Sequence, residues 1–334
     1  MLNAAIVGLG RWGQRLVDSV QGEGVEASSL IRFRKGYART PSRVQDYADK
    51  RGITLAASFE DLLADHAVDA IVLATPHSQH VGQVLQCAAI RRPVFVEKPL
   101  ALNLVDALRV RKACDDAGIV LALGHNRRFF PAMQEMRRLA RTGALGTLLH
   151  VEGNFSGSFG LDYDSSVWRA SEKEAPGGGL TLMGVHILDA MIDLLGPISA
   201  VAATSLRLVL RIELDDTSAC AIGFAGGQSG YMSTLTATAR LWRMQLFGTG
   251  GWAHVLDHEI LEVGLTGQPV RRMTWPAVDA ERHVMEAFAR AVAGAAAYPV
   301  PLDDVINGIA VTFVPILAAY YLTREGEHTG GTGK

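Results

Sequence analysis

The feature that most constrains this chain is a glycine-rich turn, G-L-G-R-W-G, which begins at Gly8 directly after an apolar segment. The pattern predicts a strand at Ala4–Val7 and a helix at Gly10–Gln21 on either side of the turn. In a dinucleotide-binding turn of this spacing, Gly8 permits the tight bend, Gly10 lets the backbone approach a pyrophosphate, and Gly13 lets the helix pack closely. We therefore expect a domain that binds a dinucleotide at a helix N-terminus.

The pattern changes near residue 124. Before it, short apolar runs alternate with amphipathic stretches, which is typical of βαβ units and a parallel sheet. The strands expected there are Val25–Ile31, Val68–Ala74, Val94–Val96 and Ile119–Leu123. The helices expected there are His80–Ile90 and Asn103–Ala117. After it, consecutive strand-like segments joined by short turns predict a largely antiparallel sheet. Helices expected to cover that sheet are Ala132–Arg141, His186–Leu195 and Ala280–Ala293, followed by a terminal helix at Asp303–Arg324.

We therefore predict an α/β protein with two domains and a tail. Residues 1–123 form a doubly wound Rossmann domain, 124–325 an α/β domain with an open, mostly antiparallel sheet that binds substrate and mediates oligomerisation, and 326–334 a flexible tail. The 334 residues, 49% of them hydrophobic, suffice for two packed cores. The net charge of −2 gives no overall attraction to nucleic acid or to a membrane.

The remaining composition favours a soluble, cytoplasmic protein without a metal. The apolar runs fall short of the roughly 20 residues that span a bilayer, and the N-terminus has no secretory signal pattern. Three separated cysteines, Cys87, Cys114 and Cys220, fit neither a disulfide framework nor a metal site. We expect no nucleic-acid or membrane partner.

The residues after the second predicted strand favour NADP. The position roughly 20 residues beyond the glycine turn commonly holds an acid that binds the ribose 2′-hydroxyl of NAD. Here it is Arg32, and Arg34, Lys35, Arg39 and Arg43 follow. Guanidinium groups suit a 2′-phosphate, so we expect NADP to bind through Arg32 and Arg34. NAD remains possible, and the alternative is a solvated basic loop.

Four further motifs accompany the glycine turn: A-T-P-H-S-Q-H at 74–80, V-E-K-P-L at 96–100, G-H-N-R-R-F at 124–129 and G-G-G-L-T-L-M-G-V-H-I-L-D at 177–189. With them, nearly the whole chain resembles the Gfo/Idh/MocA oxidoreductases, which include glucose–fructose oxidoreductase and inositol dehydrogenase. The resemblance implies a Rossmann domain followed by an α/β domain whose open sheet often forms the oligomer interface. A homodimer or homotetramer is therefore expected.

The resemblance also implies roles for individual residues. Lys98 matches a lysine that contacts nicotinamide and substrate, and His186 matches the catalytic histidine. Histidine suits proton transfer because its ordinary pKa is near 6.5; the alternative is a buried structural histidine. The other cofactor contacts implied are Gly8, Gly10, Arg11, Trp12, Gly13, Thr75, Pro76, His80 and Glu97.

One position departs from the family pattern. Leu182 lies four residues before His186, where the family commonly has an aspartate, and an isobutyl group cannot hydrogen-bond a substrate hydroxyl. This departure puts an ordinary sugar-alcohol substrate in doubt. Asp189 lies one helical turn after His186 and could orient the imidazole or replace part of the missing carboxylate.

Polar and aromatic residues near the strand ends are candidates for substrate binding. They suit a polyhydroxylated ligand, and the arginines could hold a carboxylate; each could instead serve loop structure or interdomain packing. The candidates are His125, Arg127, Asn154, Tyr163, Trp168, Arg169 and Asp189.

The leading hypothesis is an NADP-preferring oxidoreductase acting on a carbonyl or secondary alcohol of a sugar, polyol or related small molecule. The alternatives are a reductase of C=N or conjugated C=C bonds, and a non-catalytic NADP-binding sensor.

Overall fold

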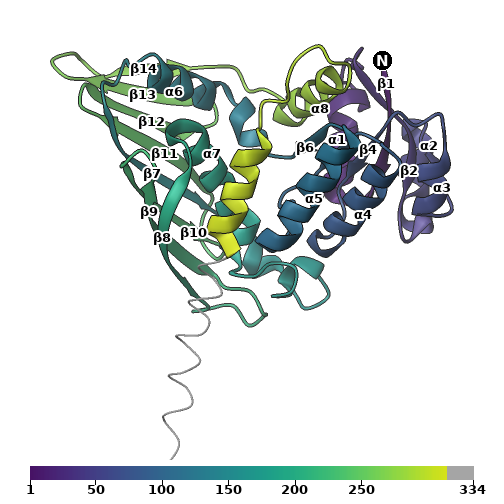
Figure 1. Cartoon of the computed structure of the whole chain (residues 1–334). Helices are drawn as coiled ribbons and strands as arrows, with labels where there is room; N and C mark the ends of the chain where they lie inside the picture. The colour runs from purple at the N-terminus through teal and green to yellow at the C-terminus, as the bar shows by residue number, and fades with distance from the viewer. Residues whose placement is uncertain (314–334) are drawn as a thin grey trace, which may run out of the picture. The chain divides into compact units, whose positions relative to one another are not determined.

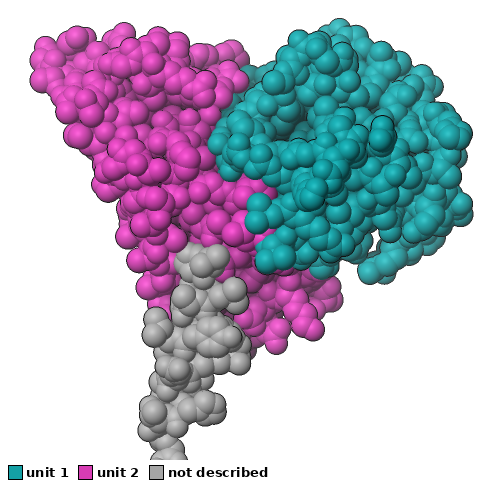
Figure 2. All heavy atoms as spheres, viewed as in Figure 1, with its two compact units in different colours: residues 1–101, 105–129, 278–305 teal, residues 102–104, 130–277, 306–334 magenta. Residues whose placement is uncertain are grey.

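The computed structural model describes residues 1–313, which fall into two compact units coloured separately in Figure 2. Unit 1 comprises residues 1–101, 105–129 and 278–305, and unit 2 comprises 102–104, 130–277 and the chain from 306. The second half of the predicted terminal helix, from residue 314, and the whole predicted tail at 326–334 lie outside the described residues. Within residues 1–313, no helix combines the length and apolar character that crossing a bilayer would require.

Unit 1 is built on a parallel sheet of six strands in the order β3-β2-β1-β4-β5-β6, which confirms the doubly wound fold (Figure 1). The strands are β1 Leu2–Val7, β2 Ile31–Tyr37, β3 Thr54–Leu55, β4 Ala70–Leu73, β5 Val94–Val96 and β6 Leu121–Leu123. The central strands β4 and β5 are buried along their whole length, because helices cover both faces of such a sheet. The helices are α1 Arg11–Gln21, α2 Gln45–Arg51, α3 Phe59–Ala64, α4 His77–Ala89 and α5 Leu104–Ala117.

The second strand lies six residues later than predicted. The expected strand at Val25–Ile31 is wrong, and β2 begins at Ile31. In β2 the buried Ile31 and Phe33 alternate with exposed Arg32 and Arg34, so its charged positions hid it from a search for apolar runs.

Helix α8, Ala280–Val292, belongs to unit 1, whereas the sequence placed it over the second sheet. It packs against α1, where Arg15 forms ion pairs with Asp279 at 3.0 Å and Glu281 at 2.8 Å. Amphipathic spacing shows that a helix has a buried face but does not identify the partner of that face.

Unit 2 contains a sheet of eight strands in the order β14-β13-β12-β11-β7-β10-β9-β8. Every neighbouring pair is antiparallel except β7 with β10, which confirms the predicted mostly antiparallel sheet. The strands are β7 Leu148–Ser156, β8 Ile198–Leu206, β9 Thr217–Phe224, β10 Ser229–Leu235, β11 Leu241–Gly248, β12 Gly251–Asp257, β13 Ile260–Leu265 and β14 Arg271–Thr274. Helices α6 Pro131–Arg141 and α7 Val185–Leu195 pack on one face of this sheet and bury the core of the unit there (Figure 1).

Candidate active site

The glycine turn between β1 and α1 combines two crowded glycines with one open glycine. Gly8 has a φ of 91°, and a Cβ there would lie 2.7 Å from the carbonyl oxygen of Ala74. A Cβ on Gly13 would lie 2.0 Å from the carbonyl oxygen of Gly8. Gly10, by contrast, has nothing within 4 Å of its Cβ position, and it begins α1 without a side-chain cap. The open helix N-terminus fits the pyrophosphate of a dinucleotide.

His80 connects the ends of two neighbouring strands. Its Nδ1 lies 2.7 Å from the carbonyl oxygen of Pro99, and its Nε2 lies 3.0 Å from that of Thr75. His80 was expected to contact the cofactor. Its ring has no exposed surface, so it cannot touch a cofactor directly. His80 instead fixes the turn at Thr75 and Pro76 relative to the segment that carries Lys98.

Lys98 follows β5 next to Glu97, whose carboxyl group is buried. A Cβ on Gly124 would lie 2.6 Å from Glu97 Oε1, so the glycine makes room for this carboxyl. Burial raises the pKa of Glu97 to about 7, and the nearby charge of Glu281 acts in the same direction, while Lys98 opposes them. Near neutral pH, Glu97 is therefore a proton-exchanging group beside Lys98.

Glu281 of α8 stays ionised although it is also buried. Burial alone would raise the pKa of Glu281, but Asn126 Nδ2 donates to Oε1 at 2.9 Å, and Arg15 lies 2.8 Å from Oε2. These contacts outweigh burial and hold its pKa below the ordinary value. Glu281 and Arg15 were not predicted from the sequence, because no local pattern joins residues that are more than 150 positions apart.

Glu97 gives a testable pH dependence of stability. Its raised pKa means that the unfolded chain ionises first, so this group destabilises the fold progressively as pH rises from about 4.5 to about 7. The full effect is about 3 kcal/mol. Between pH 5 and pH 8, Glu97→Gln should therefore gain up to about 3 kcal/mol of unfolding free energy relative to wild type, measured by urea unfolding without cofactor. Substitution of the exposed Glu60 by glutamine is the matched control, and equal pH dependence in Glu97→Gln and wild type would contradict the assignment.

The end of β2 lies beside the glycine turn, because Gly8 N donates to Tyr37 O at 2.9 Å. Arg32 is at the other end of the strand, where it pairs in register with Asn3 of β1. Five residues of strand span about 16 Å, and Arg34 Nε donates to the Asn3 side chain at 3.2 Å. Placing Arg32 and Arg34 at the ribose was therefore wrong, and it followed from the misplaced strand.

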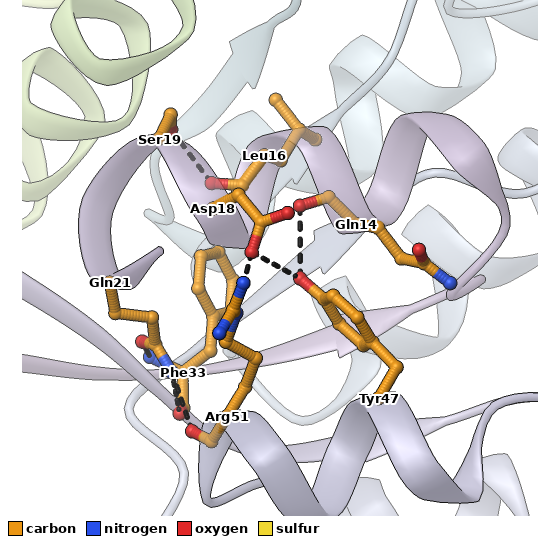
Figure 3. A network of polar contacts seen from close by, with 8 residues as sticks. All are labelled: Gln14, Leu16, Asp18, Ser19, Gln21, Phe33, Tyr47 and Arg51. Atoms are coloured by element: carbon orange, nitrogen blue, oxygen red, sulfur yellow. Dashed lines mark hydrogen bonds and ion pairs between the residues drawn. The ribbon is translucent and has the colours of Figure 1, made fainter. Parts of the chain in front are cut away.

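A network of polar contacts holds β2 and α2 against α1 (Figure 3). Asp18 Oδ1 accepts hydrogen bonds from Tyr47 at 2.9 Å and from Arg51 at 2.7 Å. Gln21 exchanges two hydrogen bonds with the backbone of Phe33. The guanidinium of Arg51 is therefore held by Asp18 of α1.

Between these two fixed elements lies the segment 38–44. Its first residue is the buried Ala38, and the side chains of Arg39 and Arg43 are exposed. This segment follows the strand end beside the glycine turn, so Ala38, rather than Arg32, occupies the place where an acid would select NAD.

In unit 2, His186 is on the first turn of α7, after the π-helical turn Leu180–Gly184. His186 is 7% exposed, and its ring centroid lies 5.9 Å from that of Phe155 on β7. Asp189, one turn further along α7, is 4% exposed. The helix thus presents a largely buried histidine with a buried carboxyl on the next turn.

Asn154 does not share this environment. Its side chain donates to Ser233 at 2.8 Å and accepts from Ser156 at 2.7 Å. Side chains alternate between the faces of a strand, and Phe155 faces His186, so Asn154 lies on the opposite face of the sheet. Asn154 was predicted to bind substrate, and its position on the face opposite His186 argues against that prediction.

The other substrate candidates divide between the units. Tyr163 packs into an apolar cluster with Leu182, while the guanidinium of Arg169 stacks 4.1 Å from the ring of Trp168. His125 and Arg127 lie in unit 1, at the turn after β6. Each unit therefore carries one predicted catalytic residue and part of the predicted substrate set.

Comparison with family models identifies both parts of the chain. Residues 2–125 match a model described as "Oxidoreductase family, NAD-binding Rossmann fold", and residues 133–254 match the "GFO/IDH/MocA C-terminal domain".

Among curated proteins, trans-1,2-dihydrobenzene-1,2-diol dehydrogenase of Sus scrofa is 29% identical over 66% of this chain and 64% of its own length. The 2,7-anhydro-N-acetylneuraminate hydratase of Escherichia coli is 27% identical over 59% of this chain and 50% of its own length. The alignments thus span less than two thirds of these relatives.

Solved structures share the fold over nearly the whole chain. Levoglucosan dehydrogenase in complex with NADH and levoglucosan superposes with a TM-score of 0.86 at 20% identity, covering 96% of this chain and 97% of the other. The aldose-aldose oxidoreductase of Caulobacter crescentus superposes with a TM-score of 0.83 at 24% identity, covering 97% and 98%.

Proposed function

This chain belongs to the Gfo/Idh/MocA family of oxidoreductases, and we propose that it transfers a hydride between NADP and the carbonyl or secondary alcohol of a sugar, polyol or related small molecule. The observation that carries the proposal is the open helix N-terminus at Gly10, at the same edge of the sheet as Lys98. The relatives named above act on a cyclic diol and on sugar derivatives, which supports this substrate range.

The proposed chemistry divides between the cofactor and two side chains. A nicotinamide cofactor held at the glycine turn would supply the redox chemistry, taking up a hydride in oxidation and providing one in reduction. His186 takes the proton of the substrate hydroxyl in oxidation, and its protonated form returns a proton in reduction. The Lys98 ammonium stabilises negative charge that develops on a substrate oxygen.

The test of this function is a panel of sugars, inositols, keto acids and imines, followed through the absorbance of NADPH. Turnover of an alcohol or its ketone is the expected result. Turnover of imines alone would favour the C=N reductase instead, since Leu182 removes the carboxylate that suits a hydroxylated substrate. Tight cofactor binding without any turnover would favour a sensor.

The preference for NADP should depend on Arg39. Its guanidinium is exposed just beyond the strand end that borders the glycine turn, where it can pair with a 2′-phosphate. We expect Arg39→Asp to lower the ratio of NADPH affinity to NADH affinity about a hundredfold, because a charge-assisted contact is lost and a repulsion is added. Both dissociation constants are measurable by cofactor fluorescence.

Arg32→Asp is the matched control, since Arg32 is also exposed but lies near the opposite end of β2. It should leave the ratio unchanged. A shift caused by Arg32→Asp and not by Arg39→Asp would contradict the placement of the ribose, and tighter binding of NADH than of NADPH by wild type would contradict the preference itself.

A further inference from the structure

Apolar side chains lie close to His186 in unit 2, in space on β7 and in sequence just before α7. Leu182, four residues before it, packs in a cluster with Met183, Phe155 and Tyr163. The Phe155 ring lies 5.9 Å from the imidazole and contacts Trp242 edge-on, with ring centroids 5.3 Å apart. The proposed proton acceptor thus lies at the end of a row of aromatic rings and beside an aliphatic side chain.

This environment bears on the part of the substrate next to the reacting carbon. Neither the Leu182 side chain nor the Phe155 ring offers a hydroxyl group a conventional hydrogen-bond partner, so a hydroxyl buried against them loses its water without compensation. A CH₂ group at the same place is favoured, because it has no hydrogen bonds to lose and gains apolar contact. The Leu182 side chain and the Phe155 ring, which we call the apolar walls, therefore favour a substrate ring with CH₂ next to the reacting carbon over one with CHOH there.

We propose that the substrate is an alicyclic secondary alcohol, or its ketone, whose ring is apolar beside the reacting carbon, rather than a polyhydroxylated sugar. This rests on the proposed dehydrogenase function. In oxidation, the carbinol C–H bond breaks and its hydride passes to NADP⁺. The O–H bond breaks and its proton passes to His186, the carbonyl C=O forms, and the rest of the ring is unchanged.

A series with a constant ring tests the proposal in the wild-type protein: cyclohexanol, trans-cyclohexane-1,2-diol and myo-inositol, with NADP⁺ reduction as the readout. An apolar pocket discriminates against added hydroxyls by roughly ten- to a hundredfold. We expect kcat/KM to fall along the series, by at least about tenfold from the diol to inositol.

Two variants test the walls themselves. Leu182→Asp should raise kcat/KM for inositol relative to cyclohexanol by about a hundredfold, whereas Leu182→Met should leave the ratio unchanged. Phe155→Tyr adds one hydroxyl to the wall without changing its shape and should move the ratio in the same direction, so the test does not depend on the folding of Leu182→Asp. Leu208→Asp is the matched control, since Leu208 is 67% exposed.

The outcomes separate the inference from the function on which it rests. A wild-type preference for inositol, or a ratio that neither Leu182→Asp nor Phe155→Tyr moves, overturns the apolar substrate while leaving a dehydrogenase. Failure to oxidise the three alcohols and to reduce cyclohexanone, in a protein that turns over another alcohol or carbonyl of the wider panel, overturns the inference alone. Failure on the whole panel, in a protein that binds NADPH, overturns the proposed function and the inference with it.

Discussion

Replacing His186 with asparagine should lower kcat by about three orders of magnitude, and replacing Lys98 with methionine should have a similar effect. Positioned proton transfer contributes roughly 10²- to 10⁴-fold to rates, and asparagine keeps a polar side chain while losing the exchangeable imidazole. A fixed ammonium beside a developing alkoxide contributes about as much in a site that excludes water. Steady-state kinetics with the best substrate of the panel gives both values.

The double variant is the sharper measurement. Lys98 lies in unit 1 and His186 in unit 2. If both act on the same substrate oxygen, removing the second after the first should cost far less than it does alone, as in other catalytic sets that act as a unit. Fully multiplicative losses, near 10⁶-fold, would show two independent roles.

Two controls separate chemistry from folding. Substitution of the exposed His283 by asparagine should change nothing, and NADPH affinity should survive in His186→Asn. Near-native turnover of either single variant on the true substrate would contradict its assignment.

The elements that the sequence predicted well are those defined by local pattern. The spacing of Gly8, Gly10 and Gly13 after an apolar segment predicted the turn, β1 and α1. Helical spacing of apolar residues predicted α6 and α7. β2 was misplaced because Arg32, Arg34 and Lys35 interrupt its apolar positions, while the segment before it carries fewer charges. Because the strand end was misplaced, Arg32 was assigned to the ribose, whereas Ala38 and Arg39 are the residues that follow the observed end of β2.

The candidate site residues also divide into those that local motifs predicted and those that they did not. Lys98 and His186 were found through motifs, and Leu182 as a departure from one of them. The contacts among Arg15, Asn126 and Glu281 were not foreseeable, because they depend on α8 returning to the first unit after the whole of the second sheet. Such pairings are set by tertiary packing, which hydrophobic periodicity alone does not specify.

Gly13→Ala should damage the fold and cofactor binding together. A Cβ would lie 2.0 Å from the carbonyl oxygen of Gly8, so either the turn or α1 must move. We expect a loss of about 3 kcal/mol of stability without cofactor, as for other overpacked positions, and NADPH binding weakened by at least about a hundredfold. Calorimetric unfolding and fluorescence titration measure the two effects.

Gly10→Ala separates these two effects within the same turn. Its φ of −71° suits alanine, and nothing lies within 4 Å of the added methyl group, so the melting temperature without cofactor should equal that of wild type. The methyl group would project into the open space at the N-terminus of α1, and NADPH binding should weaken if the pyrophosphate approaches there. Unchanged NADPH affinity in Gly10→Ala would show that the open space is not the phosphate site. An unchanged melting temperature in Gly13→Ala would show that close packing is not what requires glycine at that position.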